Sequence, residues 1–558
     1  MFDQDSSLAL GSPRFSDSRL ARLAVAKGTP AAWREALIAH GAQAANSVTG
    51  DFAVGLHEPG GRSFAAVDRF AIQTLCYRVV NGQLRFATRA DVLADADTPI
   101  DPQAIFDYLY FHIIPSPRTI YKGIYRLPPG HYALFENGQL TVAPYWVPTF
   151  EEQQNASFDA LKDEFRQLLR DAVATQLDGS KPACFLSGGT DSSTVAGMLA
   201  LSSGKTAATY SIGFDTQGYD EMEFARIAAN HFKTEHHEYY VTPDDLVRSI
   251  PAVAAHYDQP FGNSSALPTY YCAKMAREDG VSKLLAGDGG DELFGGNTRY
   301  AKQRVFGWYD SIPAALRGNL LEPVAALQTM RRIPLISKAA SYVNQASVPM
   351  PDRMMTYNLL TRFGVESVLT DKLLADVDQQ YPVRHQRNAW DLVQSGSLVN
   401  RMLAFDWRYT LADCDLPKVM GTTEMAGVAV GFPLLDDRLL AFSQKLPTTY
   451  KLRGLKLRWF FKEALRGFLP DEILVKKKQG FGLPFGVWAN THPALKALAT
   501  DSLHSLAARG VVRADFVQPL ICQRLQEHPG YYGEMVWILM MLEQWLAAKA
   551  PRFSLVAK

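Results

Sequence analysis

Two short segments of the sequence each place aspartates in a glycine-rich turn directly after an apolar run. The first, FLSGGTDSS, spans residues 185–193 and contains Asp191; the second, LLAGDGGDELFGG, spans residues 284–296 and contains Asp291. Glycines leave backbone N–H groups open to an anion, and the N-terminus of a following helix adds partial positive charge. On its own, the first segment is equally consistent with a tight turn in which Asp191 and Ser192 cap a helix.

Taken together, the two turns predict a phosphate site that uses a metal ion. If both turns follow strands of one sheet, Asp191 and Asp291 can hold one Mg²⁺, which prefers oxygen ligands and usually keeps few protein carboxylates beside phosphate oxygens. The chain lacks the GxxxxGK[ST] sequence of a Walker-type loop. We therefore expect a nucleoside triphosphate to be held between two acidic, glycine-rich turns.

A third segment, VKKKQGFGLPFGVW (475–488), contains three consecutive lysines. Such a run is more typical of a solvated face than of a site. Here it precedes a Gly-Phe-Gly-Leu-Pro stretch that could form an ordered loop, so one lysine could point inward. A lysine near a pyrophosphate leaving group would stabilise the charge that develops there.

The turns need a scaffold, and the pattern after residue 158 indicates one. A helical stretch, FDALKDEFRQLLRDAVATQL, is followed by the apolar runs PACFL, ATYSIGF, EYYV and KLLAG, with helix-like segments between them. This alternation is typical of an α/β fold with a doubly wound parallel sheet, which binds ligands beyond the carboxyl ends of its strands. Residues from about 300 to 545 look largely helical, and WILMMLEQWL near the end is expected to be a buried helix.

The N-terminal part of the chain has a different character. Residues 50–146 read as short strands separated by the turn sequences HEPGG, VNGQ and ENGQ, and the polar stretch 147–157 reads as a linker. We therefore expect two domains, a reduced β-rich domain over residues 1–150 and a doubly wound, helix-rich domain over residues 158–550.

Composition excludes several classes of function. The 57 basic and 57 acidic residues cancel, which argues against a nucleic acid or an anionic membrane as the main partner. No apolar run is long enough to cross a bilayer, and the opening MFDQDSSLAL does not resemble a secretory signal, so a cytoplasmic location is expected. The five scattered cysteines form no CxxC pair, which argues against disulfides and structural zinc.

In combination, these segments resemble the asparagine synthetase family, whose synthetase domain belongs to the pyrophosphatase-loop ATP enzymes. The resemblance implies use of ATP and Mg²⁺ in an AMP-forming reaction: a carboxylate attacks the α-phosphorus, pyrophosphate leaves, and an amine then displaces AMP. The similar segments, besides the three above, are GDFAV (50–54), VDRFAIQTLCYRV (67–79), LPPGHY (127–132), YSIGF (210–214), DEMEFARIAANHF (220–232), DQPFGNSSALPTYY (258–271) and PLLDDRLLAF (433–442).

The resemblance also implies roles for individual residues. Asp191 and Asp291 would ligate Mg²⁺, and Lys478 would be the lysine that reaches the phosphates. The pyrophosphate cradle would consist of Leu186, Ser187, Gly188, Gly189, Asp191 and Ser192, with Gly287, Asp288 and Gly289 on the facing loop and Ile212 and Gly213 against the adenine.

The N-terminal part departs from the family pattern. Members that hydrolyse glutamine use a cysteine at the mature N-terminus, whereas residue 2 here is Phe and the first cysteine is Cys76. RGPD-like and NGE-like glutamine-pocket segments are missing, and GDFAV already appears at residue 50. We therefore expect a shortened, inactive class II glutaminase-like domain that does not supply ammonia.

A second departure concerns the amine. Shortly before its PLLD-like run the family usually has a glutamate and an arginine, where this chain has Ala429 and Gly431. The missing glutamate, expected to help deprotonate ammonia, argues against plain asparagine synthesis, although Glu424 could substitute. Tyr270 and Tyr271 are expected to pack between sheet and helix. The alternative is that one of these tyrosines lies near the acceptor amine and serves as its base. His236 and His237 have no acidic or cysteine partner in a metal-site spacing, so a ligand role is disfavoured.

The sequence thus predicts an ATP-dependent, AMP-forming amide ligase that does not take nitrogen from glutamine. Within the family this resembles enzymes that close rings, namely lasso-peptide cyclases and β-lactam synthetases, of which the peptide cyclase is favoured. Its expected substrate is a peptide or small-molecule carboxylate, with a precursor peptide and a leader-processing protein as candidate partners and neither nucleic acid nor membrane. The alternatives are an asparagine synthetase that uses ammonia and a non-catalytic scaffold that kept the fold.

Overall fold

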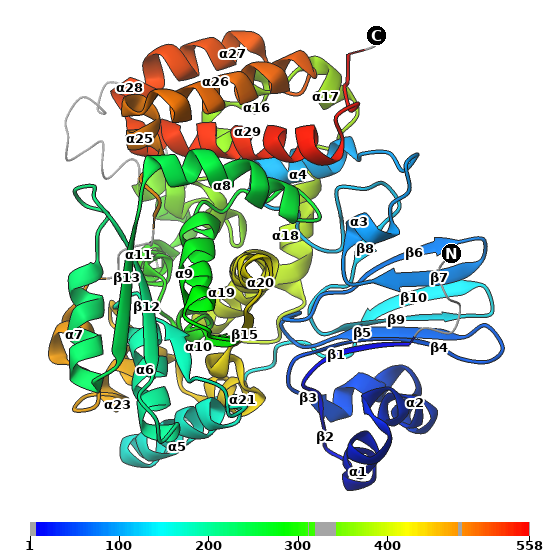
Figure 1. The fold of residues 1–558 in the computed structure, drawn as a ribbon, viewed down its shortest axis with the longest axis vertical. Helices are drawn as coiled ribbons and strands as arrows, with labels where there is room; N and C mark the ends of the chain where they lie inside the picture. The colour runs from blue at the N-terminus through cyan, green and yellow to red at the C-terminus, as the bar shows by residue number, and fades with distance from the viewer. Residues whose placement is uncertain (1–6, 154, 311, 318–341, 478–481, 557–558) are drawn as a thin grey trace.

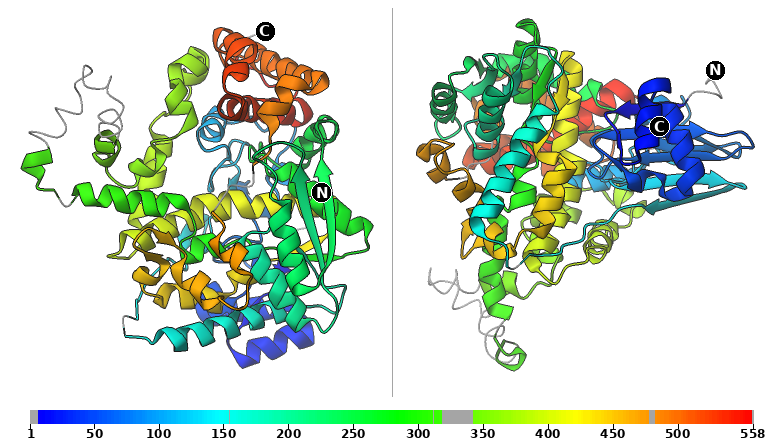
Figure 2. Two further views of the ribbon diagram at one scale, coloured as in Figure 1. Left: turned by 90° about the vertical axis from the view of Figure 1, so that its left-hand side faces the viewer. Right: turned by 90° about the horizontal axis from the view of Figure 1, so that it is seen from below.

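The computed structural model of the chain describes residues 7–153, 155–310, 312–317, 342–477 and 482–556. A β-rich N-terminal region lies beside a larger C-terminal region in which helices surround a parallel sheet (Figure 1). Seen from below, the N-terminal region (blue) lies to one side of the helices of the C-terminal region (Figure 2). The sequence-based fold class, a β-rich region followed by an α/β region, is confirmed.

Two antiparallel sheets form most of the N-terminal region. The turns Asn81–Gly82 and Asn137–Gly138 have positive φ at both residues, as two-residue hairpin loops require, so the VNGQ and ENGQ sequences do connect adjacent strands. The larger sheet has the order β1 (Leu8–Gly11), β4 (Phe52–His57), β5 (Ser63–Val67), β9 (His131–Glu136), β10 (Gln139–Pro144), and the smaller has the order β7 (Gln83–Ala87), β6 (Cys76–Val80), β8 (Tyr125–Arg126).

Helices cover part of these sheets, which the strand-like sequence pattern did not indicate. Trp33 of α2 is fully buried against Phe15 and Phe52, so the α1–α2 hairpin closes one side of the larger sheet. The elements of this region outside the two sheets are α1 (Ser18–Lys27), α2 (Thr29–His40), η1 (Gly41–Ser47), α3 (Ala90–Leu93), α4 (Pro102–Phe111) and the short pair β2 (Arg14–Phe15) and β3 (Val48–Thr49).

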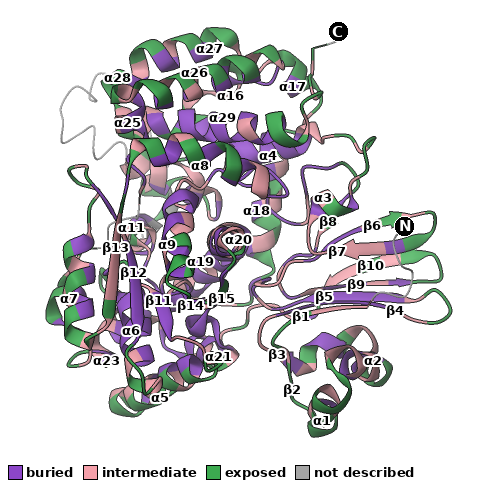
Figure 3. Ribbon diagram, viewed as in Figure 1, coloured by how far each residue is buried: buried purple, intermediate pink, exposed green. Residues whose placement is uncertain are grey.

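The C-terminal region is built on five parallel strands. Their order is β13 (Glu235–Val241), β12 (Ala208–Phe214), β11 (Ala183–Phe185), β14 (Lys283–Leu285), β15 (Ala429–Gly431). Buried residues dominate β11 and β12 (Figure 3). The four predicted strands are therefore present, and β15 adds a fifth at one edge.

Helices cover both faces of this sheet. Val195 of α6 and Ala225 of α7 belong to the buried cluster on one face, whereas Ala273 of α9 packs with Ala208 and Tyr210 on the other. This arrangement confirms the expected double winding. The helices associated with the sheet are α5 (Phe158–Ala174), α6 (Thr190–Ser202), α7 (Met222–Phe232), α8 (Pro243–His256), α9 (Ala266–Glu278), α10 (Gly290–Phe294) and α20 (Leu416–Ala426).

Further helices complete the C-terminal region. In chain order they are α11 (Thr298–Asp310), α12 (Ala314–Leu316), η4 (Asp352–Met355), α15 (Leu359–Phe363), α16 (Val365–Val368), α17 (Asp371–Ala375), α18 (Tyr381–Asp391), α19 (Leu398–Asp406), the π-helix η5 (Trp407–Asp415), η6 (Pro433–Leu435), α21 (Asp437–Lys445), α22 (Thr448–Lys451), α23 (Trp459–Ala464), α24 (Asp471–Val475), α25 (Phe485–Thr491), α26 (Pro493–Ala508), α27 (Ala514–Pro519), η7 (Leu520–Arg524), α28 (Leu525–Glu527) and α29 (Pro529–Lys549); a hairpin of β16 (Leu452–Arg453) and β17 (Lys456–Leu457) precedes α23.

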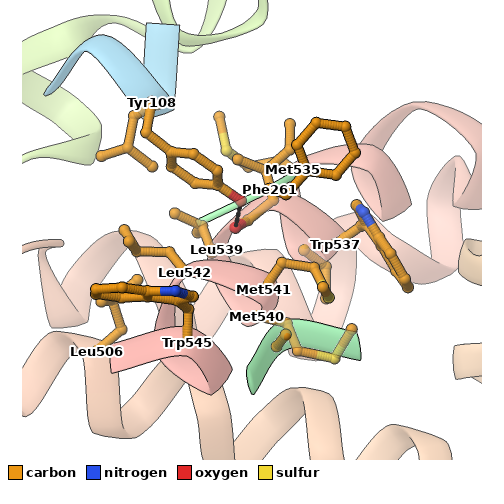
Figure 4. Packing of buried hydrophobic residues seen from close by; sticks show 14 of the residues in the cluster. Tyr108, Phe261, Leu506, Met535, Trp537, Leu539, Met540, Met541, Leu542 and Trp545 are labelled. Carbon is orange, nitrogen blue, oxygen red and sulfur yellow. Dashed lines mark hydrogen bonds between the residues drawn. The ribbon is translucent and has the colours of Figure 1, made fainter. Parts of the chain in front are cut away.

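The helix α29 contains WILMMLEQWL and is buried on most sides, as its continuous apolar sequence requires (Figure 4). Tyr108 of α4 donates a hydrogen bond to the carbonyl of Ile538, 2.9 Å away. On another side, the Trp537 and Trp545 indoles donate to the carbonyls of Gly262 and Tyr257. The helix thus ties the N-terminal region to the loop that starts at residue 257.

No described helix is both long and apolar enough to cross a membrane.

Candidate active site

A cavity of about 940 Å³ lies beyond the carboxyl ends of β11 and β14, where an open α/β sheet binds its ligands. The glycine-rich loop after β11 and the one after β14 form one side of it. The π-helix η5 and the start of α20 contribute Asp415 and Lys418, and residues of the segments 455–463 and 474–477 complete the lining. Its size suits a mononucleotide with part of a second substrate.

The two loops pack directly against each other because β11 and β14 are adjacent parallel strands. A Cβ atom on Gly287 would lie 2.7 Å from the backbone nitrogen of Ser192, and one on Gly290 would lie 2.3 Å from Oδ1 of Asp191. Glycine is therefore required at both positions: the backbone at Gly287 lies against the backbone of Ser192, and the backbone at Gly290 lies against the carboxylate of Asp191. The sequence had suggested that the loops face each other, and they are in contact.

Asp191 and Asp291 converge on a single atom. Nη1 of Arg458 lies 2.6 Å from both carboxylate oxygens of Asp191 and 2.7 Å from Oδ1 of Asp291. Arg458 directly precedes α23, and its side chain is only 8% exposed. The sequence offered no sign of this arginine as a site residue.

The two carboxylates fit a magnesium ion by donor type. They supply hard oxygen ligands that reach one point, and the described residues contain no group of three or more His, Cys, Asp and Glu side chains that could enclose a metal. Two carboxylates with open remaining positions match an ion that is also bound by phosphate oxygens. Asp191 and Asp291 are therefore the residues that could hold Mg²⁺ in this cavity.

Two lysines, Lys462 and Lys476, add positive charge to the lining of the cavity. Lys476 Nζ lies 3.0 Å from Glu221 and donates to the carbonyl of Gly188, 3.4 Å away. Lys462 Nζ donates to the carbonyl of Leu474, and burial, together with Arg458, lowers the pKa of this lysine. Lys478, the lysine expected to reach the phosphates, lies outside the described residues.

Most of the predicted nucleotide residues line this cavity, but two glycines do not. Gly188 has φ +67° and lies against the backbone of Phe224 and Ala225 in α7, and Gly213 lies beneath the Tyr240 ring. These two glycines permit close packing behind the cavity. The predicted residues that line the cavity are Leu186, Ser187, Gly189, Asp191, Ser192, Ile212, Gly287, Asp288, Gly289 and Asp291.

Beside the metal position the cavity has a second polar group of residues. Lys418 Nζ lies 3.0 Å from Asp415 and 3.7 Å from Asp288. Burial raises the pKa of Asp288 to about 6 despite the nearby lysine, and burial together with Asp415 raises the pKa of Glu292 to about 8. At neutral pH Asp288 is thus mostly ionised and Glu292 mostly neutral.

Comparison with known proteins identifies the family. The family model described as asparagine synthase matches residues 164–547, and the one described as glutamine amidotransferase domain matches residues 34–146. This chain is an asparagine synthase family member. The relatives include asparagine synthetase [glutamine-hydrolyzing] 1 of Bacillus subtilis, 25% identical over 490 residues (86% of this chain, 74% of the relative), and amidase chyE of Penicillium rubens, 25% identical over 513 residues (79% and 71%). Another is amidase chry2 of Gibberella zeae, 23% identical over 491 residues (78% and 70%).

The N-terminal region of this asparagine synthase family member holds one cysteine, Cys76, in an unreactive setting. Its side chain is fully buried on β6, and burial raises the pKa of the thiol to about 11, so the nucleophilic thiolate is scarce at neutral pH. The Phe86 ring also occupies the space above Gly55, where a Cβ atom would lie 2.3 Å from the ring. The space between the two sheets is filled by side chains at this point.

The family's glutamate and arginine positions fall on the short edge strand β15, which contains Ala429 and Gly431. Ala429 is exposed, Gly431 is buried near the Gln176 side chain, and neither residue lines the cavity. Glu424, the candidate substitute, is well exposed, pairs with His256 at 3.5 Å and does not line the cavity.

The remaining sequence candidates lie away from the cavity lining. Tyr271 stacks on Tyr239 and donates its hydroxyl proton to the carbonyl of Asp245. His237 has two acidic neighbours: Glu235, two residues earlier in the chain, at 3.2 Å, and Asp279 at 3.0 Å. Tyr271 is therefore a packing residue, as expected, and Asp279 approaches His237 only through the fold.

Proposed function

We propose that this protein is an AMP-forming amide ligase that activates a substrate carboxylate with ATP in this cavity. The observation that carries the proposal is the convergence of Asp191 and Asp291 on one point between two glycine-rich loops at the ends of β11 and β14. When bound between them, Mg²⁺ would neutralise charge on the phosphates. Family membership supports ATP-dependent amidation; the AMP-forming course and the substrate belong to the proposal.

In the first step, an oxygen of the substrate carboxylate forms a bond to the α-phosphorus, and the bond from that phosphorus to pyrophosphate breaks. The backbone N–H groups of the loop after β11 would hold the leaving pyrophosphate. Lys476 and Arg458 also line the cavity, and their positive charges would offset the increasing negative charge on the pyrophosphate. No covalent intermediate with the protein is needed, since positioning and charge account for such displacements.

In the second step, an amine nitrogen attacks the acyl carbon, the bond from that carbon to AMP breaks, and the nitrogen loses a proton. Asp288 is the best-suited acceptor for that proton. It lines the cavity, and a pKa of about 6 leaves it ionised at neutral pH yet basic enough to accept a proton. Glu292, with a pKa near 8, is mostly protonated there and would donate a hydrogen bond instead.

The amine is proposed to belong to the same molecule as the carboxylate, so that the product is a ring. Cys76, the cysteine of the N-terminal region, is buried and protonated, and β15 lacks the family's acidic side chain at residue 429. An amine already tethered to the carboxylate has a high effective concentration and needs no delivered ammonia. A peptide whose N-terminal amine joins an Asp or Glu side chain is the favoured substrate.

Exchange of labelled pyrophosphate into ATP separates the candidate functions. We expect exchange with peptides that carry both an N-terminal amine and an internal Asp or Glu, together with a product that has lost one water by mass spectrometry. Exchange with aspartate alone, and asparagine on adding ammonium, would replace the ring-closing proposal by ammonia-dependent asparagine synthesis. Exchange with neither substrate class, in protein that binds no nucleotide, would support a non-catalytic scaffold.

A further inference from the structure

Arg458 occupies the point where the two loop carboxylates meet. Its backbone N–H donates to the carbonyl of Gly295, 3.1 Å away, at the end of the second loop, and its φ of +50° is one that non-glycine residues rarely adopt. The backbone of Arg458 is thus fixed at this point. The hairpin β16–β17 and helix α23 deliver the arginine from a part of the chain distant in sequence from either aspartate.

The guanidinium uses one nitrogen on both carboxylates. Nη1 contacts Asp191 and Asp291, whereas Nε and Nη2 donate to none of the residues that the structure describes. The side chain lines the cavity and is more than nine-tenths buried. A buried arginine normally satisfies its other donors, because an unmade hydrogen bond in the interior is costly. These donors remain available to an anionic ligand in the cavity.

The charges also favour replacement of Arg458 by a divalent metal ion at the two carboxylates. Arg458 supplies one positive charge to the two carboxylates, whereas a divalent ion supplies two. An arginine bound to both carboxylates competes with the metal for the same oxygens. Phosphates entering the cavity offer the guanidinium a bidentate partner that suits it as well as a carboxylate does.

We infer that Arg458 is an exchangeable counter-ion of the metal site: it holds Asp191 and Asp291 together until magnesium and the nucleotide arrive, and then moves from the carboxylates to the phosphates. This inference rests on the proposed function, since it takes MgATP as the ligand. It makes metal binding conditional on the nucleotide, because the metal alone would have to displace the arginine without offering it another anion. If the contact were instead a permanent ion pair, its loss would lower stability and would not create affinity for a metal.

Titration calorimetry with Mg²⁺ alone, without nucleotide, tests the inference on wild type, Arg458→Gln, Arg458→Lys and the control Arg453→Gln. Arg453 lies in the same hairpin, is exposed and stacks on Trp459 without contacting either aspartate. We expect Arg458→Gln to bind Mg²⁺ at least about tenfold more tightly than wild type, the factor that loss of a charge-assisted hydrogen bond would produce. Arg458→Lys should fall between the two, and Arg453→Gln should match wild type.

Thermal melts give a second readout on the same variants. Mg²⁺ should raise the melting temperature of Arg458→Gln and leave that of wild type nearly unchanged. If Arg458→Gln folds only with Mg²⁺ present, the inference is also supported. Equal Mg²⁺ affinity in wild type and both Arg458 variants would overturn it. The inference would also be overturned if Arg458→Gln stayed unfolded in the presence of Mg²⁺ while Arg458→Lys behaved as wild type does. Calorimetry of wild type with MgATP distinguishes failure of this inference from failure of the proposed function. If wild type binds MgATP but Arg458→Gln does not bind Mg²⁺ more tightly, only the role of Arg458 is overturned.

Discussion

Arg126 of the N-terminal region forms a buried ion pair with Asp258 of the C-terminal region, with Nη2 2.9 Å from Oδ2 and 3.0 Å from Oδ1. The backbone N–H of Ala90 donates to the same carboxylate at 2.8 Å. Asp258 lies in the loop between α8 and α9, and indoles of α29 donate hydrogen bonds to the carbonyls of Tyr257 and Gly262 at this loop. The loop leads into α9, whose residues Pro268 and Thr269 line the cavity. The N-terminal region therefore helps to position one wall of the active site.

Replacing Arg126 by Met is expected to destabilise the protein by about 3–5 kcal/mol, because Asp258 would remain buried without its main counter-charge. Denaturant unfolding measures this change. Arg513→Gln is the matched control: its pair with Asp515 is exposed, and it should cost no more than about 1 kcal/mol. Equal, small losses in both variants would show that the interface does not depend on the buried pair.

Replacing Gly287 by Ala should weaken nucleotide binding. The added Cβ would lie 2.7 Å from the Ser192 nitrogen, so the two loops would have to separate. Gly396→Ala is the control, since a Cβ at residue 396 meets no atom within 4 Å. We expect fluorescence titration with a nucleotide analogue to show at least about a tenfold loss for Gly287→Ala, the factor that corresponds to about 1.4 kcal/mol. Unchanged affinity would mean that nucleotide binding tolerates separation of the loops.

The buried Lys451 makes stability depend on pH. Its Nζ donates to Oδ1 of Asn400 at 2.8 Å, and burial lowers its pKa to about 7. Between that value and the ordinary pKa of 10.5, the unfolded chain binds the proton and the folded chain does not, so this residue's contribution to stability increases as pH rises from 7 to 10. The stability of wild type relative to Lys451→Met should rise over this window by up to a few kcal/mol. Parallel pH curves for the two proteins would contradict the assignment.

The rate of amide formation should depend on ionised Asp288. Since burial raises the pKa of this carboxyl to about 6, the rate should increase as pH rises through 6 and level off above it. Asp288→Asn should lower the rate by about 10²–10⁴-fold and abolish this part of the pH profile. Single-turnover amide formation from preformed adenylate isolates the step. A profile in Asp288→Asn that still rises near pH 6 would assign the proton acceptor to another residue.

Local sequence signals were sufficient for four of the five parallel strands and for the two glycine-rich loops. Alternating apolar runs and glycine-rich turns are short-range features, and Asn-Gly pairs at 81–82 and 137–138 require positive φ wherever they lie. The strand β13 begins at Glu235 although only EYYV was expected to be extended. Glu235, the first residue of this strand, is half exposed, as is possible for a charged side chain on an edge strand.

Features that depend on long-range packing could not be predicted. Arg458 lies in a short basic stretch that resembles an exposed hairpin, and only the folded chain brings it to Asp191, 267 residues away. The same holds for Asp288, whose pKa is raised by burial and by Asp415 despite the nearby Lys418. Gly213 matches the family pattern, yet the Tyr240 ring lies over it and Gly213 does not line the cavity.

The most direct test of the account is calorimetry of Mg²⁺ with a non-cleavable α,β-methylene analogue of ATP, performed on wild type, Asp191→Asn and Asp291→Asn. The account predicts one binding event in wild type and a loss of at least about 100-fold in affinity in each variant, with unchanged circular dichroism, because each variant removes a metal ligand from a polar cavity and leaves the core intact. Asp501→Asn, on the exposed face of α26, should bind as wild type does. Absence of binding in wild type, or equal affinity in all four proteins, would contradict the central claim that these two aspartates hold the metal and the nucleotide.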